Sequence, residues 1–171
     1  KLRENPKHRQ RIDDEFVEAL FKMAPLHDIG KIGIPDRILL KPEELTEEEY
    51  ALMKSHTLVA GRIFEEARAE LGPNSFLTVA EEVCRCHHEK WDGSGYPRGL
   101  KGEEIPLAAR IMALADVYDA MVSHRVYKDS MDPGEVASSL RTKSGSHFDP
   151  DVVEAFLGIK DEFSRIAEKY R

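Results

Sequence analysis

Apolar residues recur at helical spacing along most of the chain, and the apolar–polar alternation that marks β-strands is nearly absent. The first example follows Asp13-Asp14, a pair that can cap a helix. The apolar side chains after it repeat on one helix face: Phe16, Leu20, Phe21 and Ala24. Helices with one apolar face must bury that face against each other. The sequence therefore predicts one all-α domain over residues 1–171.

Start and stop signals divide this pattern into separate helices. Thr46-Glu47-Glu48-Glu49 is a capping box, and we expect its helix to reach His56, with a further helix up to Leu71. Gly72-Pro73 then ends it, because glycine adopts the left-handed cap and proline cannot extend a helix. Four later helices are predicted from Ser75 before an apolar run, Pro106 before a run of small residues, Asp132-Pro133 and Asp149-Pro150.

Composition and charge narrow the classes of function. Hydrophobic residues make up 41% of the 171 residues and charged residues 33%, the balance of a globular domain. Neither a bilayer-long apolar stretch nor a signal peptide is present, which predicts a cytoplasmic chain or the cytoplasmic part of a larger protein. The net charge of −7 argues against binding long nucleic acid, which requires a basic face. A small phosphate ligand stays compatible, because a few cations or bound metals can invert the local field.

Cys84 and Cys86 are the only cysteines. Two positions apart on a helix, their side chains point roughly 200° from each other and cannot easily share one ion. A zinc knuckle with the neighbouring His87-His88 is one alternative. We interpret the pair as two buried, reduced thiols.

Histidines and aspartates recur at the predicted helix ends. His27-Asp28 follows the first helix, and imidazole with carboxylate suits Mn, Fe, Zn or Ni better than Mg alone. Adjacent helical residues differ by about 100°, so the pair can meet one ion only where the backbone turns. Gly30 and Gly33 allow such a turn. Alone, this dipeptide or the lone His56 is more typical of a surface or core-edge position than of a ligand.

Two further elements carry the same chemistry. His87-His88 stands at a helix end before the glycine-rich loop 91–102. Adjacent side chains diverge, so the pair suits two ions, or one ion and one role in supporting another ligand, better than chelation of one ion. Asp116 and Asp119 have the spacing that places both carboxylates on one face of an otherwise apolar helix. Burying them there is costly unless cations lie beside them.

These elements predict a mixed nitrogen–oxygen site if the helices pack around one cavity. Two ions in such a site can share a bridging hydroxide, activate water and stabilise the entering and leaving oxygens of an attack on phosphorus. Asp28 is the natural bridging ligand, because a carboxylate has two oxygens to share and an imidazole has not.

Three ordered motifs resemble the signatures of HD-GYP domains, a bacterial subgroup of the HD metal-dependent phosphohydrolases. They are His27-Asp-Ile-Gly-Lys-Ile-Gly-Ile-Pro-Asp36, His87-His-Glu-Lys-Trp-Asp-Gly-Ser-Gly-Tyr-Pro97 and Ile111-Met-Ala-Leu-Ala-Asp-Val-Tyr-Asp-Ala120. The similarity runs from about Pro25 to about Tyr127 and continues more weakly through Gly145 to Pro150. Each motif is moderately specific alone, and the ordered set is very specific. The resemblance implies an HD-domain helical bundle with the glycine-rich loop at the mouth of the metal site.

The resemblance also implies an activity, the hydrolysis of cyclic di-GMP to linear pGpG and in some members onward to GMP. The implied cofactors are two or three divalent ions, with Fe or Mn preferred and Zn, Ni or Mg as other candidates. The implied metal ligands are His27, Asp28, His56, His87, His88 and Asp116. Asp28 and Lys31 take the catalytic roles, and Lys31 supplies positive charge to the scissile phosphate. Substrate contacts fall to Gly95, Tyr96, Pro97, Asp119, Arg125 and Lys128.

One feature departs from the family pattern. Members usually carry a histidine on a helix before the stretch at which this chain begins, whereas residues 1–12 resemble the basic loop after that helix. We therefore expect an HD-GYP domain that lacks its first helix, preceded in the full protein by a receiver or sensor domain. His8 is the histidine available upstream, and its context does not match that of a ligand.

Two other functions remain open from the sequence. The first is a binding module that holds cyclic di-GMP, or a partner such as a cyclase domain at Gly95-Tyr96-Pro97, without hydrolysis. The second is an HD phosphohydrolase that acts on another nucleotide or cyclic dinucleotide. A homodimer is compatible with either function and with the phosphodiesterase.

Overall fold

The computed structural model describes residues 1–72, 74–123 and 131–169, and these residues form helices and loops. Within these ranges the only β-type pairing is one isolated bridge between Ser144 and Phe148. The predicted all-α fold is therefore confirmed. The α-helices are α1 (Asp14–Met23), α2 (Asp36–Leu39), α3 (Glu47–Lys54), α4 (His56–Leu71), α5 (Ser75–Cys86), α6 (Leu107–Val122), α7 (Pro133–Thr142), α8 (Pro150–Leu157) and α9 (Lys160–Lys169). Short 3-10 helices are η1 (Leu2–Glu4), η2 (Ala24–Leu26), η3 (Ile29–Gly33) and η4 (Gly102–Glu104).

Side-chain caps begin the helices where the sequence predicts. Asp13 accepts a hydrogen bond from the Phe16 amide at the start of α1. Thr46 and Glu49 form the reciprocal capping box of α3. α7 and α8 start immediately after capping aspartates, each followed by proline. These confirmed starts are local, because a cap bonds to amides only two or three residues away.

Three details differ from the sequence prediction. Phe21, expected on the apolar face of α1, is 80% exposed. Pro106 is the N-cap residue of α6 and not its first helical residue. The charged C-terminal segment forms α9, which the sequence analysis did not predict. Exposure and helix ends depend on which residues pack against a segment in the folded protein. Helical periodicity in the sequence does not specify those neighbours.

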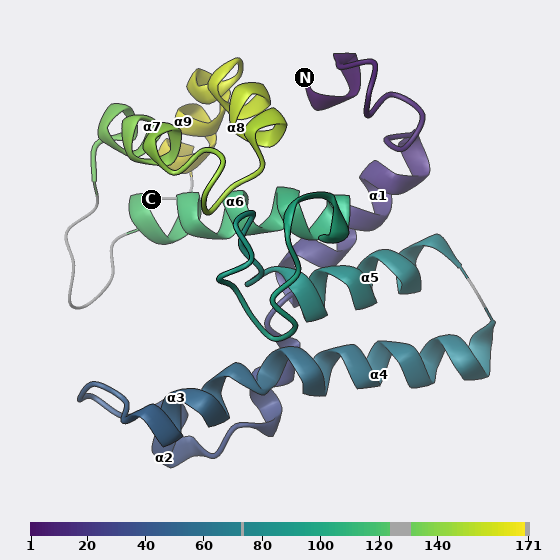
Figure 1. Ribbon diagram of the computed structural model, residues 1–171, viewed down its shortest axis with the longest axis vertical. Helices are drawn as coiled ribbons and strands as arrows, with labels where there is room; N and C mark the ends of the chain where they lie inside the picture. The colour runs from purple at the N-terminus through teal and green to yellow at the C-terminus, as the bar shows by residue number, and fades with distance from the viewer. Residues whose placement is uncertain (73, 124–130, 170–171) are drawn as a thin grey trace.

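The helix α6 lies between two apolar cores (Figure 1). On one side it packs with α1, α4 and α5 around buried residues that include Met23, Ala60, Val83 and Met112. On the other side it packs with α7 and α8, and Phe163 of α9 joins that core. In Figure 1, α4 and α5 run side by side below α6, while α7, α8 and α9 gather above it. Of the helices described, none has both the length and the hydropathy to cross a membrane.

Close packing between η3 and α4 depends on a glycine. A Cβ atom at Gly30 would lie 1.9 Å from the carbonyl oxygen of His56, so a larger residue cannot occupy this position. The contact brings the loop after α1 against the first turn of α4. Gly30 thereby allows Asp28 and His56, which are far apart in sequence, to approach each other.

The cysteines behave as predicted. Cys84 and Cys86 are free and buried in α5. Burial raises the pKa of each thiol to about 12. Both thiols therefore stay protonated at neutral pH, the form that does not bind metal.

Candidate metal centre

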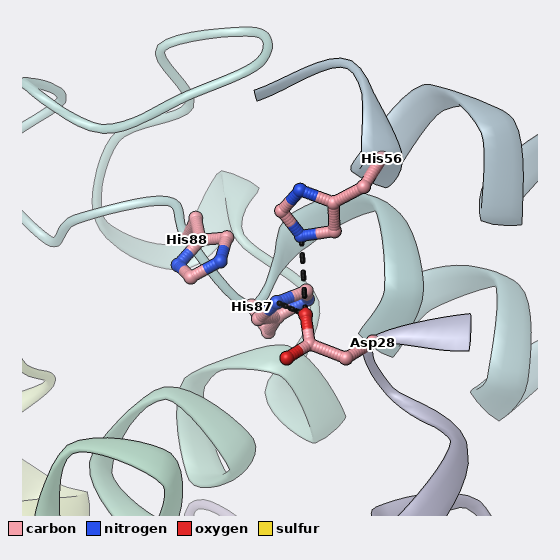
Figure 2. Close-up of side chains that lie close together, drawn as sticks. All are labelled: Asp28, His56, His87 and His88. Atoms are coloured by element: carbon pink, nitrogen blue, oxygen red, sulfur yellow. Dashed lines mark ion pairs between the residues drawn. The ribbon is translucent and has the colours of Figure 1, made fainter. Parts of the chain in front are cut away.

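Polar side chains from three separate segments meet at the start of η3, the start of α4 and the end of α5. Asp28 is the N-cap residue of η3, and His56 is the first residue of α4. His87 is the C-cap residue of α5, and His88 follows it. One potential ligand atom from each of these four residues lies within 4.8 Å of the others (Figure 2). Such a group can hold a metal ion.

Backbone carbonyls orient three of the imidazoles in the same way. Nδ1 of His27 lies 2.7 Å from the carbonyl oxygen of Ala24. The corresponding distance is 2.7 Å for His56 and Met53, and 2.9 Å for His87 and Val83. A carbonyl only accepts, so each Nδ1 must carry the proton and donate. In the neutral ring Nε2 then keeps its lone pair, the state that a metal requires.

Three buried atoms that could each bind a metal have no hydrogen-bond partner: Asp28 Oδ1, His56 Nε2 and His87 Nε2. Asp28 Oδ1 lies 3.3 Å from His56 Nε2 and 3.7 Å from His87 Nε2, and the dashed lines in Figure 2 mark these pairs. Lone pairs that face each other in a buried space repel unless a cation or proton lies between them. The residues present therefore fit a metal ion.

The second oxygen of Asp28 faces a different set of groups. Asp28 Oδ2 lies 3.5 Å from His27 Nε2 and forms an ion pair with Lys31. His27 Nε2 also lies 3.6 Å from Asp116 Oδ1 on α6. Asp28 thus stands between one set of donors from α4 and α5 and another from the end of η2 and from α6. This arrangement can serve two ions with one shared carboxylate.

The electrostatics favour the unprotonated forms of Asp28, Asp116 and His88 at neutral pH, whereas contact with Asp116 outweighs burial and raises the pKa of His27. Burial raises the pKa of Asp28, but the ion pair with Lys31 lowers it, and the pKa lies well below its usual range. Contact with His27 lowers the pKa of Asp116. Burial, with the neighbouring imidazoles, lowers the pKa of His88 to about 3. Metal binding requires such deprotonated ligands.

The glycine-rich loop between α5 and α6 covers one edge of the cluster. The ring of Tyr96 stacks on the ring of His88 with centroids 4.8 Å apart and planes 28° apart. Its amide donates a hydrogen bond to the His88 carbonyl, 3.2 Å away. Lys54, at the end of α3, lies 5.7 Å from the Tyr96 ring centroid and 5.1 Å from that of Tyr50. An aromatic and cationic border therefore adjoins the metal ligands.

Comparison with known proteins decides the family. The model of the HD domain matches residues 2–152. The chain belongs to the HD domain family. A protein from Vibrio cholerae named cyclic di-GMP phosphodiesterase is 48% identical over 97% of this chain and 34% of its own length. A second V. cholerae protein, named 3'3'-cGAMP-specific phosphodiesterase 2, is 40% identical over 93% of this chain and 30% of its own length.

A solved structure supports the HD fold. The crystal structure of a cyclic GMP-AMP-specific phosphodiesterase of V. cholerae (V-cGAP3) matches with a TM-score of 0.53 and 20% identity, over 93% of this chain and 41% of that one. This HD domain therefore spans about a third of the length of the relatives it matches. Together, the family match and the relatives confirm the resemblance to HD-GYP domains that the three sequence motifs indicated.

The HD domain brings together most of the residues that the motifs predicted. His27, Asp28, Lys31, His56, His87, His88 and Asp116 are linked by the contacts given above, and Tyr96 joins them through His88. The divergence expected for the adjacent histidines is wrong. The rings of His87 and His88 lie 4.0 Å apart, because α5 ends at Cys86 and the backbone turns there. Both residues can face one ion.

Asp119 and His8 lie outside this cluster. Asp119 is exposed, and its Oδ1 accepts a hydrogen bond from Ser123 at 3.3 Å. The expectation that it shares a buried face with Asp116 is wrong, since positions three apart differ by about 60° around a helix and this turns Asp119 to solvent. Arg125 and Lys128 lie outside the described residues. His8 is buried at a distinct place, with Nε2 2.9 Å from Asp151 on α8.

Two residues beside the site were missed by the sequence analysis. Glu89 is a buried carboxylate directly after His88, and it accepts hydrogen bonds from the loop. Lys54 stands two residues before His56, beside two tyrosine rings. The position of Glu89, between two ligands and a glycine-rich loop, is a signal that could have been used. Lys54 offers no such signal, because lysines are common on helix surfaces.

Proposed function

We propose that this HD domain is a metal-dependent phosphodiesterase that hydrolyses cyclic di-GMP to linear pGpG, with onward hydrolysis to GMP as a further step. The observation that carries the proposal is the convergence of three buried, unpartnered donor atoms on Asp28, His56 and His87. Its substrate is suggested by the V. cholerae relative named cyclic di-GMP phosphodiesterase. The aromatic border at Tyr96 adds a ring on which a base can stack.

The proposed ligands divide into two groups around Asp28. His56, His87 and His88 would hold one divalent ion with Asp28 Oδ1. His27 and Asp116 would hold a second ion with Asp28 Oδ2. When bound, such ions supply Lewis acidity and lower the pKa of a water molecule. Fe or Mn are the candidates that the resemblance to HD-GYP domains favours, and mixed imidazole and carboxylate donors are compatible with either.

The side chains around these ligands would handle the phosphate and the base. Lys31, now paired with Asp28, is positioned to exchange that contact for the negative charge that grows on the scissile phosphate. Tyr96 would bind the substrate through its ring or its hydroxyl, and Arg125 with Lys128 would bind the phosphates. An upstream receiver or sensor domain, a cyclase-domain partner and a homodimer stay predictions.

A turnover assay tests the proposal. Protein loaded with Fe or Mn without oxygen is mixed with cyclic di-GMP, and pGpG is separated by ion-exchange chromatography. We expect product with the parent protein and none above background with His56→Ala. The matched control is His8→Ala, which removes a histidine as deeply buried as His56 but outside the metal centre. No product with either metal would refute hydrolysis, and tight binding without product would favour the binding module.

One relative suggests a second candidate substrate. The V. cholerae relative at 40% identity is named for 3'3'-cGAMP, in which one guanine is replaced by adenine. The same assay with the two cyclic dinucleotides side by side separates the alternatives. We expect a higher kcat/KM for cyclic di-GMP, because the relative named for that substrate is the more similar one. A higher value for 3'3'-cGAMP would reverse the assignment.

A further inference from the structure

Glu89 connects the metal centre to the glycine-rich loop. Its side chain is 2% exposed and lies directly after the ligand His88. One carboxylate oxygen, Oε1, accepts a hydrogen bond from the Arg98 amide at 2.8 Å. The other, Oε2, accepts one from the Leu100 amide at 3.0 Å. A single buried carboxylate thus satisfies two backbone donors on the part of the loop that follows Tyr96-Pro97.

The backbone of Glu89 also contacts the part of the loop that precedes Tyr96. A Cβ atom at Gly95 would lie 2.5 Å from Glu89 Cα and 2.3 Å from the Lys90 amide nitrogen, so only glycine fits there. Residues on both sides of Tyr96 are therefore held against the same short segment. The Tyr96 amide bonds to the His88 carbonyl within that segment.

The base of the loop has separate supports. The amides of Trp91 and Asp92 donate to the carbonyls of His147 and Ser146, at 3.0 and 2.8 Å. The Gly102 amide closes the loop by donating to the Trp91 carbonyl at 2.9 Å. These contacts hold the two ends but do not reach Arg98 or Leu100. We call residues 98–100 the tip of the loop, and Trp91, Asp92 and Gly102 its base. Glu89 holds the tip, and backbone contacts hold the base.

We propose that Glu89 is a positioning residue that fixes the tip of this loop and thereby keeps the Tyr96 ring on His88. Its charged carboxylate suits this role, since hydrogen bonds to an ionised acceptor are stronger than neutral ones. Glutamine cannot replace it, because its amide nitrogen only donates and one loop amide would lose its acceptor. The consequence for substrate binding rests on the proposed function; the consequence for loop order does not.

Limited trypsin digestion measures loop order directly. Arg98 is exposed, and cleavage after it requires the tip to leave the Glu89 carboxylate. We expect Glu89→Gln to be cleaved after Arg98 about tenfold faster than the parent, because one loop amide loses a hydrogen bond to a charged acceptor and cleavage follows the population of the open loop. Glu89→Asp keeps the charge on a shorter side chain, and we expect an intermediate rate.

A matched control lies in the same loop. Glu104 also accepts a backbone hydrogen bond, from Lys101 at 2.9 Å, but it is exposed and acts at the outer turn. Glu104→Gln should leave cleavage after Arg98 within about twofold of the parent, because exposed polar substitutions usually have small effects. Unchanged cleavage in Glu89→Gln would overturn the proposal. Faster cleavage of Glu89→Gln at sites throughout the chain would also overturn the proposal, because Glu89 would then support the whole fold. If Glu89→Gln does not fold, the cleavage rate of Glu89→Asp decides.

A double-mutant cycle tests whether Glu89 acts through Tyr96. We expect Glu89→Gln to raise the KM for cyclic di-GMP with little change in bound metal, measured by elemental analysis. In a Tyr96→Ala background the same substitution should change KM less than about twofold, because the residue it positions is gone. If Glu89→Gln raises KM by the same factor in the parent and in the Tyr96→Ala background, Glu89 does not act through Tyr96. A parent protein without turnover would refute the proposed function, while the digestion would still decide the role of Glu89.

Discussion

Two aspartates, the half-buried Asp28 and the buried Asp149, have opposite surroundings. Asp149 is 2% exposed, and each of its oxygens faces a donor. Its Oδ2 accepts from Arg110 Nη1 at 2.6 Å, and its Oδ1 accepts from the Asp151 amide at 2.8 Å as the cap of α8. At Asp28, by contrast, Oδ1 faces the lone pairs of His56 and His87 and accepts no hydrogen bond.

The difference separates a structural carboxylate from a ligand. The region around Asp149, which we call the Asp149 corner and define as Arg110, His147, Phe148 and Asp149, pairs a negative charge with a positive one. The metal centre gathers acceptors that have no proton to share. In the Asp149 corner, the charge of Asp149 is neutralised by Arg110 of the same chain. In the metal centre, the facing lone pairs are neutralised only when a cation binds. Two carboxylates of the same type therefore predict opposite responses to substitution and to metal.

The largest expected effect is on activity at the metal centre. Asp28→Asn should lower kcat/KM by more than about 100-fold, because loss of even an outer partner of a metal ligand typically costs 10- to 100-fold. Its melting temperature should change much less than that of Asp149→Ala. Turnover and thermal unfolding measured on the same preparations check both statements. An active Asp28→Asn enzyme would show that this carboxylate is not a ligand.

The second effect is the reverse, a loss of stability at the Asp149 corner. Asp149→Ala should lower the free energy of unfolding by about 3–5 kcal/mol, because removing one partner leaves the Arg110 charge buried and unpaired. For a domain of this size the melting temperature should fall by roughly 6–20 °C. Below that temperature, kcat should stay close to that of the parent. Arg110→Met with Asp149→Leu is the control, since removal of both charges should restore much of the loss.

The local part of the fold could be predicted from the sequence, and the reason is the range of each interaction. Asp13, Thr46, Asp132 and Asp149 cap helices by bonding to amides two or three residues away, so their effect is visible in the sequence. α9 has no such cap and no fully buried residue. It is held by Phe163 against Tyr118 and Phe156, at centroid distances of 5.1 and 5.0 Å, contacts that exist only after folding.

The metal centre was predicted in part for the same reason. Motif resemblance indicated which residues are candidate ligands, but their convergence depends on packing such as that of Gly30 against His56. The face on which Asp119 lies, and the role of Glu89, depend on helix ends and loop turns that a motif does not specify. Sequence thus predicted the chemistry of the site better than its geometry.

A smaller effect concerns metal and stability. Adding Mn²⁺ should stabilise the parent by about 2.7 kcal/mol at a concentration 100 times its dissociation constant, since a ligand that binds only the folded state shifts unfolding by mass action. His56→Ala should lose most of this shift. Asp149→Ala should keep it, although it starts from a lower melting temperature. Equal shifts in all three proteins would place the binding outside the metal centre and remove the contrast between the two aspartates.

The smallest effect is a pH dependence within the Asp149 corner. Burial, with the charges of Lys90 and Lys143, lowers the pKa of His147 to about 4. An unfolded histidine has a pKa of about 6.5, so between these values the unfolded chain binds the additional proton. Stability should therefore fall as the pH drops from about 6.5 to about 4, with His147 contributing a slope of up to about 1.4 kcal/mol per pH unit.

Replacing the histidine isolates its contribution. His147→Gln should remove this slope while leaving the slopes from other groups, and urea unfolding at three pH values between 4.5 and 7 measures it. The Mn²⁺-induced shift at pH 7 should be the same as in the parent, because the His147 ring stacks on that of Phe148 and is not one of the proposed ligands. An unchanged pH slope would mean that His147 takes up its proton in the folded state. The contrast between the two regions would then rest on the aspartates alone.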